Sequence, residues 1–242
     1  MLTVERIGRH FGALWAVRDA TFAVSKGEVL GIIGPNGAGK STLFNLIAGA
    51  LNPSCGEIRF LDHRITNAKP YHVARLGLAR TFQIPKPFRQ LNLRENIMLS
   101  ALRRHRSPRA ADTIASQAME FVGIAHLSDN AIASLTVGQL KKLEVARALA
   151  TEPCLLLLDE VMAGLTPREI SEMMDAIRSL PERGITVIWV EHVMMAIMNV
   201  AQRLIVMQQG SVIAQGSPTE ISTNPAVIAA YLGDTYVHAA HS

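Results

Sequence analysis

The hydrophobic and polar positions of the chain follow a strand-like period toward both ends. Alternating or continuous short apolar runs predict strands at Leu2–Ile7, Ala20–Val24, Val29–Ile33, Glu57–Leu61, Leu155–Leu158 and Thr186–Val190. The four consecutive leucines of one run are typical of a strand that is buried on both faces of a parallel sheet. Two further runs flank a Gln-Gln-Gly turn and predict a hairpin made by Arg203–Met207 and Ser211–Ala214.

The middle of the chain has a helical period instead. Strand signals are absent between Leu91 and Ala150, and the pattern there predicts helices at Leu93–Leu102, Ala110–Val122 and Val137–Ala150. Elsewhere it predicts helices at Ser41–Ala48 and Pro167–Leu180, and a short one near Pro225–Leu232. The order of these elements indicates a mostly parallel α/β core with a helical subdomain inserted in its middle.

The composition is that of a globular protein, with 49% hydrophobic and 18% charged residues among 242. The net charge of +4 is small for this length and only 5% of residues are aromatic, so we expect no nucleic-acid partner. The densest basic stretch is Arg103-Arg104-His105-Arg106 with Arg109. It fits a solvated helix end, and attraction to anionic lipid headgroups is the alternative.

Cysteine content and hydropathy indicate a cytoplasmic protein without a membrane span. Cys55 and Cys154 make no disulfide framework, which fits a reducing compartment. The first residues include Glu5 and no apolar segment, so no signal peptide is expected. Because the chain has no run of about 18 apolar residues, another chain would have to hold it at a membrane.

A glycine-rich segment carries the first chemical signal. Gly34-Pro35-Asn36-Gly37-Ala38-Gly39-Lys40-Ser41, followed by Thr42, matches the pattern G-x-x-x-x-G-K-[ST] between an apolar strand and a helix. Glycines let backbone N–H groups turn toward a phosphate, and the following helix presents its positive N-terminus to the same anion. Lys40 adds a charge for the β- and γ-phosphates, and the Ser41 hydroxyl is a magnesium ligand. The motif predicts binding of ATP with Mg²⁺.

A pair of acidic residues supplies the second half of such a site. Asp159 and Glu160 come directly after the leucine run, at the end of a predicted buried strand. In that position Asp159 can hold Mg²⁺, and Glu160 can orient or deprotonate the attacking water.

Further segments make the chain resemble the ATP-binding subunit of an ABC transporter over nearly its whole length. The segment Leu135-Thr136-Val137-Gly138-Gln139 resembles the family signature, usually written L-S-G-G-Q, and its helix ends Ala146-Arg147-Ala148-Leu149. Gln83 matches the family's glutamine loop, and Ala163-Gly164-Leu165-Thr166 matches its D-loop. His192 matches the switch histidine. Phe11 lies where the family places an aromatic that stacks on adenine, and Val17 is a further residue predicted to bind the nucleotide.

This resemblance implies a single domain with the P-loop ABC-type fold, with a mostly parallel core sheet and an N-terminal antiparallel β portion. The core would comprise residues 1–83 and 151–242, and the helical subdomain about residues 84–150. Two such domains would face each other head to tail, so that each ATP lies between the phosphate loop of one and the signature of the other. The implied catalytic residues are Lys40, Gln83, Glu160 and His192, and the implied metal ligands are Ser41, Gln83 and Asp159.

The chain departs from the family pattern at four positions. Thr136 replaces the signature serine but keeps a hydroxyl, and Val137 replaces the first signature glycine. Thr166 stands at the end of the D-loop where the family commonly has Asp or Asn, and Val193 stands where an Asp usually follows the switch histidine. The change at Thr166 puts the cross-dimer contact of that residue in doubt and leaves the hydrolytic centre intact. The change at Val137 leaves fewer close backbone approaches on its side of the signature.

Three segments are similar to the LivG-type subunits of branched-chain amino acid importers. They are Gly77–Gln83 with Asn92–Asn96, and the ending Asn224–Gly233. The resemblance implies a second ATP-binding subunit, two permease subunits, a solute-binding protein outside, and a place at the cytoplasmic face of the membrane. Import of urea or amides and export of lipid or glycolipid stay open as alternatives. We also expect Ile84, Pro85 and Phe88 to help form a groove that receives a permease helix.

Overall fold

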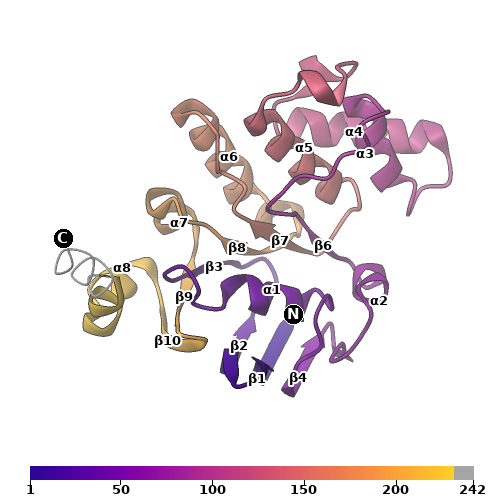
Figure 1. Cartoon of the computed structure of the whole chain (residues 1–242). Coiled ribbons are helices and arrows are strands. Elements are labelled where there is room, and N and C mark those ends of the chain that lie inside the picture. Colours follow the sequence, from indigo (N-terminus) through magenta and orange to yellow (C-terminus); the bar gives the residue numbers. More distant parts are fainter. Residues whose placement is uncertain (232–242) are drawn as a thin grey trace.

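The computed structural model describes residues 1–231 and contains two β-sheets with helices between and around them (Figure 1). The first sheet has the strand order β2-β1-β4-β5 and the second has the order β10-β9-β3-β8-β7-β6. In the described part of the chain, no helix is both long enough and apolar enough to cross a membrane.

The first sheet is antiparallel and formed by the N-terminal third of the chain. Its strands are β1 (Leu2–Phe11), β2 (Leu14–Val24), β4 (Cys55–Phe60) and β5 (His63–Arg64). The first two strands are longer than the sequence pattern predicted. The pairing of β1 with β2 shifts register at three places, and Arg6 has a φ of 47°. Such bulges interrupt the alternation of apolar and polar residues from which a strand is predicted.

The second sheet is mostly parallel and confirms the predicted core. It contains β3 (Val29–Ile33), β6 (Leu78–Arg80), β7 (Leu155–Asp159), β8 (Thr186–Val190), β9 (Arg203–Gln208) and β10 (Ser211–Gly216). Only the β9–β10 hairpin is antiparallel among these strands. Every residue of β3, β7 and β8 is buried, as expected for strands covered on both faces. The three-residue β6 was not predicted, because it is too short to show a period.

The predicted helices are present with small differences at their ends. They are α1 (Lys40–Ile47), α3 (Leu93–Ala101), α4 (Pro108–Phe121), α5 (Val137–Leu149) and α6 (Pro167–Ser179). Residues 225–231 are helical, and the predicted end at Leu232 lies outside the described residues. The short helices α2 (Pro70–Arg75), α7 (Met194–Val200) and α8 (Pro218–Ser222) were missed. The sequence of α8 carried a signal, a Ser217–Glu220 capping box.

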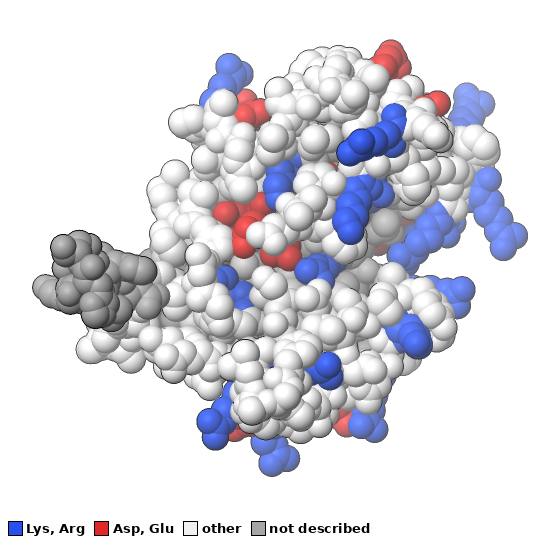
Figure 2. All heavy atoms as spheres, in the orientation of Figure 1, with Lys and Arg blue, Asp and Glu red and all other residues white. Residues whose placement is uncertain are grey.

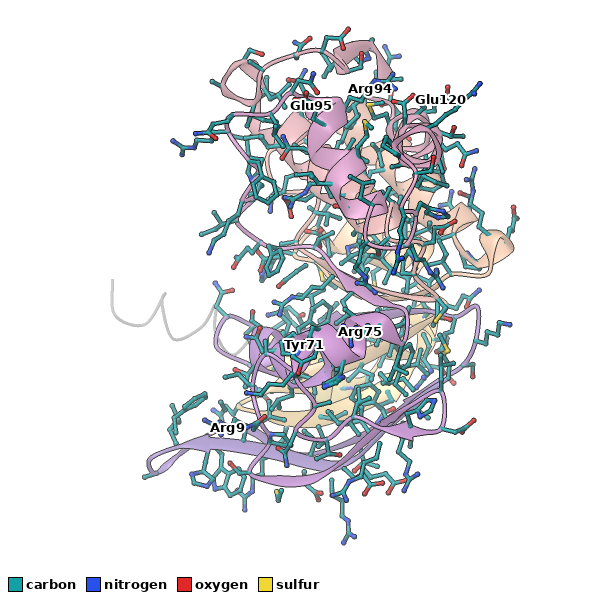
Figure 3. All side chains as sticks on the ribbon, turned by 90° about the vertical axis from the view of Figure 1, so that its right-hand side faces the viewer. Arg9, Tyr71, Arg75, Arg94, Glu95 and Glu120 are labelled. Atoms are coloured by element: carbon teal, nitrogen blue, oxygen red, sulfur yellow. The ribbon has the colours of Figure 1, made fainter. Side chains whose placement is uncertain are left out.

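Two hydrophobic clusters lie on opposite faces of the second sheet. One cluster joins α1 and the first sheet to one face, through residues such as Phe44, Ile58 and Ile188. The other cluster joins α3 to α7 to the opposite face, with the fully buried Trp189 among its members. The helices α3, α4 and α5 form a lobe beside the sheet (Figure 1). Figure 3 shows this lobe, with Arg94, Glu95 and Glu120, above the part that carries Tyr71 and Arg9.

Candidate nucleotide-binding site

The glycine-rich loop connects the buried strand β3 to helix α1. Gly34 and Gly39 have positive φ angles of 150° and 101°. A Cβ atom on Gly34 would lie 2.1 Å from the Met207 carbonyl oxygen, and one on Gly39 would lie 2.3 Å from that of Ala16. Only glycine fits both the backbone conformation and the space at these two positions. Glycine is therefore required at Gly34 and Gly39 because the loop packs so closely on neighbouring strands there.

Helix α1 and Lys40 make the loop attractive to an anion. Its N-cap, Gly39, provides no side-chain cap for the first N–H groups of the helix, which carry positive partial charge. The Lys40 Nζ atom donates to the carbonyl oxygens of Gly34 at 2.6 Å and Pro35 at 3.0 Å. Burial lowers the pKa of Lys40, and the nearby carboxylates of Glu160 and Asp159 oppose this shift. A buried ammonium of this kind gains from a phosphate beside it.

A pocket of about 620 Å³ opens over the loop. Residues 36–42 line it, and Gln83, Glu160, His192 and Gln209 face them from other segments. The structure therefore brings together the phosphate loop and three of the predicted catalytic residues, Gln83, Glu160 and His192. The remaining lining residues are Leu14, Trp15 and Ala16 of β2.

The predicted nucleotide-binding residues Phe11 and Val17 lie outside the lining of this pocket. Neither residue lines the pocket: the Arg9 guanidinium stacks on the Phe11 ring at 4.7 Å, and Val17 is fully buried. Arg9 and Phe11 lie two residues apart on β1 and so share a face of the sheet. Trp15, which pairs with His10 across the hairpin, is the aromatic residue at the pocket. The sequence signal for it was a large aromatic between two short strands, which alone is not distinctive.

Asp159 ends strand β7 with one carboxylate oxygen free. Its Oδ2 atom accepts from Arg80 Nη2 at 2.9 Å, and its backbone N–H donates to Thr81 Oγ1 at 2.9 Å. Its Oδ1 atom is buried and has no hydrogen-bond partner among the described residues. A buried, unpaired carboxylate oxygen fits a hard cation such as Mg²⁺. Asp159 and Ser41 of the lining loop are the residues that would hold it.

Glu160 is held between Gln83 and His192. Its Oε2 atom accepts from Gln83 Nε2 at 2.7 Å, and its Oε1 atom accepts from His192 Nε2 at 2.8 Å. The residue has a φ of 50°, and its backbone N–H donates to the Val190 carbonyl oxygen at 2.9 Å. A non-glycine residue with positive φ at a strand end is typical of a functional position. Three distant segments thus converge on one carboxylate that faces the pocket.

Glu191 is a site residue that the sequence reasoning missed. Its side chain is buried, and its carboxylate accepts from the backbone N–H of Met162 at 3.2 Å and of His192 at 3.0 Å. Burial raises the pKa of Glu191, and these hydrogen bonds oppose the shift. Its backbone contacts connect the segment after Glu160 with the loop that carries His192. The available signal was an acidic residue directly after a buried strand.

The signature segment lies at the start of α5, and none of its five residues lines the pocket in the described chain. Thr136 and Gln139 form a capping box: Thr136 Oγ1 accepts from the Gln139 N–H at 3.2 Å, and Gln139 Oε1 accepts from the Thr136 N–H at 2.9 Å. A Cβ atom on Gly164 would lie 3.0 Å from the Val137 side chain. The predicted site residues therefore form two separate groups within one chain.

Of the last two departures from the family pattern, Thr166 has a structural role and Val193 makes no side-chain cap. Thr166 caps α6, because its Oγ1 atom accepts from the Glu169 N–H and its own N–H donates to Glu169 Oε2. Val193 precedes α7 and provides no side-chain cap. On the face of the molecule shown in Figure 2, acidic side chains gather at the centre, between the helical lobe and the core.

Comparison with known proteins agrees with this geometry. Residues 17–163 match the family model described as ABC transporter, and residues 211–237 match one described as branched-chain amino acid ATP-binding cassette transporter. The chain is 35% identical to the branched-chain amino acid transport ATP-binding protein BraF of Pseudomonas aeruginosa, with 97% of this chain and 98% of that protein covered. It is 34% identical to LivG of Escherichia coli, with the same coverage.

Solved structures show the same fold. A nucleotide-free ATP-binding cassette from an ABC transporter has a TM-score of 0.86 and 32% identity, covering 96% of this chain and 98% of that one. An ADP conformation of such a cassette has a TM-score of 0.85 and also 32% identity, over 96% of this chain and 98% of that one. These matches agree with the fold, the phosphate loop, the acidic strand end and the signature. The chain belongs to the ABC transporter family as one of its ATP-hydrolysing, nucleotide-binding subunits.

Proposed function

We propose that this chain binds ATP with Mg²⁺ and hydrolyses it to power uptake of branched-chain amino acids by a membrane complex. The observation that carries the proposal is the position of Glu160, held by Gln83 and His192 at the edge of the phosphate pocket. A carboxylate in this position can accept the proton of a water molecule that attacks the γ-phosphate.

The roles of the chain's own residues follow from the contacts. The loop N–H groups and Lys40 bind the phosphates, and Glu160 orients the attacking water and takes its proton. Gln83 and His192 hold the Glu160 carboxylate through their hydrogen bonds, and His192 is exposed enough to reach a phosphate as well. Mg²⁺ held by Ser41 and Asp159 would neutralise charge on the phosphate oxygens.

A second cassette completes the site. The signature segment is remote from the pocket of its own chain, and Val137 is 62% exposed within it. The start of α5 combines a threonine hydroxyl with backbone N–H groups at a helix N-terminus, a suitable arrangement for a γ-phosphate. In a head-to-tail pair, each signature would meet the phosphate loop of the other chain. ATP would then close the pair and hydrolysis would open it.

Permease subunits would hold the chain at the cytoplasmic face of a membrane. Ile84 and Phe88 are 72% and 53% exposed, and Pro85 is half-buried between them. A groove of about 410 Å³ lies between α2, β6 and the helical lobe, with Phe82 in its wall. Ile84, Pro85 and Phe88, which we expected to help form the groove, do not line it and lie farther along the same segment as Phe82. Exposed apolar side chains beside Gln83 suit a permease helix docking next to the hydrolytic centre.

The solute is proposed from the relatives. BraF of Pseudomonas aeruginosa and LivG of Escherichia coli are named for branched-chain amino acid transport, and the match extends over almost the full length of each. Such an importer would also include a second ATP-binding subunit, two permease subunits and an extracytoplasmic solute-binding protein.

Uptake into vesicles tests this proposal. The chain would be reconstituted with candidate permease and solute-binding proteins of a branched-chain amino acid importer, and uptake of leucine, isoleucine, valine, urea and acetamide compared with and without ATP. We expect ATP-dependent uptake of the branched-chain amino acids. Uptake restricted to urea or acetamide, or outward movement of lipid, would contradict the proposed solute. A Lys40→Ala complex is the control that should transport nothing.

A further inference from the structure

The Arg80 side chain connects the carboxylate of Asp159 with the groove beside the helical lobe. Arg80 ends strand β6, three residues before Gln83, and its side chain is only 13% exposed. One guanidinium nitrogen, Nη2, donates to Asp159 Oδ2 at 2.9 Å, and another, Nη1, donates to Asn45 Oδ1 of α1. The guanidinium also lies over the rings of Phe44, at 5.9 Å, and Phe82, at 5.7 Å.

The same side chain lines the groove between α2, β6 and the helical lobe. Phe82 and Arg103 are also part of that groove's wall. Arg80 thus contacts the carboxylate that would bind the metal and also forms part of a surface accessible to a partner. One side chain therefore connects the Asp159 carboxylate with the groove surface.

The charges around Asp159 explain why an arginine is there. A buried carboxylate without a counter-charge is strongly destabilising. Lys40 and Lys141 are the other cations whose charge acts on Asp159, and neither makes a direct ion pair with it among the described residues. Arg80 is therefore the direct partner, and Asp159 Oδ1 and Arg80 Nε remain without hydrogen-bond partners in the described chain.

A divalent cation at Asp159 changes this balance. It brings positive charge to the carboxylate that Arg80 neutralises, and two cations on one buried carboxylate repel each other. The ion pair is then weakened when the metal arrives, and Arg80 is held only by Asn45 and the two rings. Because Thr81, Phe82 and Gln83 follow directly, a shift of Arg80 moves the segment that holds Glu160 and borders the groove.

We propose that Arg80 is a positioning residue that neutralises Asp159 while no metal is bound, and that the Mg²⁺ entering with ATP weakens this pair and shifts the Thr81–Gln83 segment beside the groove. This inference rests on the proposed function, since it requires Mg²⁺ at Asp159. It gives the metal site and the docking groove a direct physical connection, and such coupling is reciprocal. A partner that holds the groove in one arrangement therefore changes metal affinity.

Three variants separate this role from a merely structural one. Arg80→Met removes the charge and keeps an apolar side chain of similar length. Arg103→Met is the matched control, because Arg103 lines the same groove and contacts the Ala74 carbonyl oxygen, not Asp159. Arg80→Lys keeps the charge but loses the forked geometry that reaches Asp159 and Asn45 together.

The first measurement is the affinity of Mn²⁺, as a substitute for Mg²⁺, for the chain with a non-hydrolysable ATP analogue, followed by electron paramagnetic resonance. We expect Arg80→Met to tighten Mn²⁺ binding by at least about fivefold, because a competing cation is removed. Arg103→Met should leave it unchanged. Equal or weaker affinity in Arg80→Met contradicts the inference. Should that variant not fold, Arg80→Gln, which also removes the charge, replaces it: tighter Mn²⁺ binding supports the inference, and equal or weaker binding contradicts it. Arg80→Lys, which keeps the charge, should bind Mn²⁺ more like the unmodified chain.

The second measurement is amide hydrogen exchange at residues 81–83 with the analogue present, with and without Mg²⁺. The unmodified chain and Arg103→Met should show a change on adding Mg²⁺, and Arg80→Met should not. A change of the same size in all three would contradict the coupling. If the unmodified chain binds no nucleotide with Mn²⁺, the proposed function itself fails. Nucleotide binding with equal Mn²⁺ affinity in all variants refutes only the inference about Arg80.

Discussion

Replacement of Thr136 by alanine tests the claim that the signature acts on the nucleotide of a facing chain. In the structure, Thr136 has a local role as the cap of α5, through its hydrogen bond from the Gln139 N–H. In the proposed pair, the same hydroxyl also donates toward a γ-phosphate held by another phosphate loop. Thr136→Ala removes both roles at once, so the two must be measured separately.

The magnitudes of the two effects differ. Loss of an N-cap hydroxyl costs about 1 kcal/mol of folding free energy. Ser217→Ala provides the matched control, because Ser217 and Glu220 form the same kind of capping box on α8, outside the nucleotide pocket. Loss of one donor to a developing phosphate charge lowers turnover by about 100-fold or more. Thr136→Ala should therefore be about as destabilised as Ser217→Ala but far less active.

The assay combines urea unfolding, ATP binding to the isolated chain and phosphate release by the assembled pair. ATP binding by the isolated Thr136→Ala chain should be unchanged, since Thr136 does not line its own pocket. Thr136→Ser, which keeps the hydroxyl, should retain activity. The reasoning is refuted if Thr136→Ala hydrolyses ATP as fast as Ser217→Ala, because the hydroxyl would then serve only as a cap.

Two further predictions concern the phosphate loop and the docking surface. Burial lowers the pKa of Lys40 and phosphates favour its charged form, so ATP binding at alkaline pH below 10.5 should take up protons and weaken as pH rises. Calorimetry in two buffers of different ionisation enthalpy measures this uptake, and Lys40→Arg, whose guanidinium stays charged, should abolish it; equal uptake in both chains would refute the role of Lys40. Phe88→Ala should lower permease assembly and transport-coupled hydrolysis with little loss of stability, because the ring is 53% exposed and contacts Arg147 at 5.7 Å. Co-purification with the permease measures assembly, and an unchanged yield together with unchanged coupled hydrolysis would remove Phe88 from the docking surface.

Local sequence patterns predicted the parallel core and the phosphate loop because both are recognisable from consecutive residues. The runs Val29–Ile33, Leu155–Leu158 and Thr186–Val190 are buried on both faces, and the apolar pattern shows this directly. Gly34 and Gly39 of the loop are fixed by close contacts that only glycine allows. The first sheet was harder to predict, because its bulges break the alternation on which strand prediction depends.

Contacts between distant residues could not be predicted in the same way. Arg80 and Asp159 are 79 positions apart, and nothing near Arg80 in the sequence indicates a buried acidic partner. Glu191 was overlooked next to His192, because its backbone contact with Met162 exists only in the folded chain. Trp15 rather than Phe11 lies at the pocket because the hairpin pairing places the two rings differently. The resemblance to a family predicted the catalytic residues, and the structure shows which side chains contact them.

The position of Glu160 between Gln83 and His192 is the centre of this account, and Glu160→Gln tests it most directly. Glutamine has nearly the same shape and keeps an acceptor oxygen for one of the two hydrogen bonds, so folding and ATP binding should persist. It cannot take a proton from water, and phosphate release should fall by about 100- to 10,000-fold. A variant that binds ATP, traps the closed pair and releases phosphate only at this lowered rate is the predicted result. Phosphate release at close to the normal rate by Glu160→Gln would contradict the assignment of Glu160 as the base.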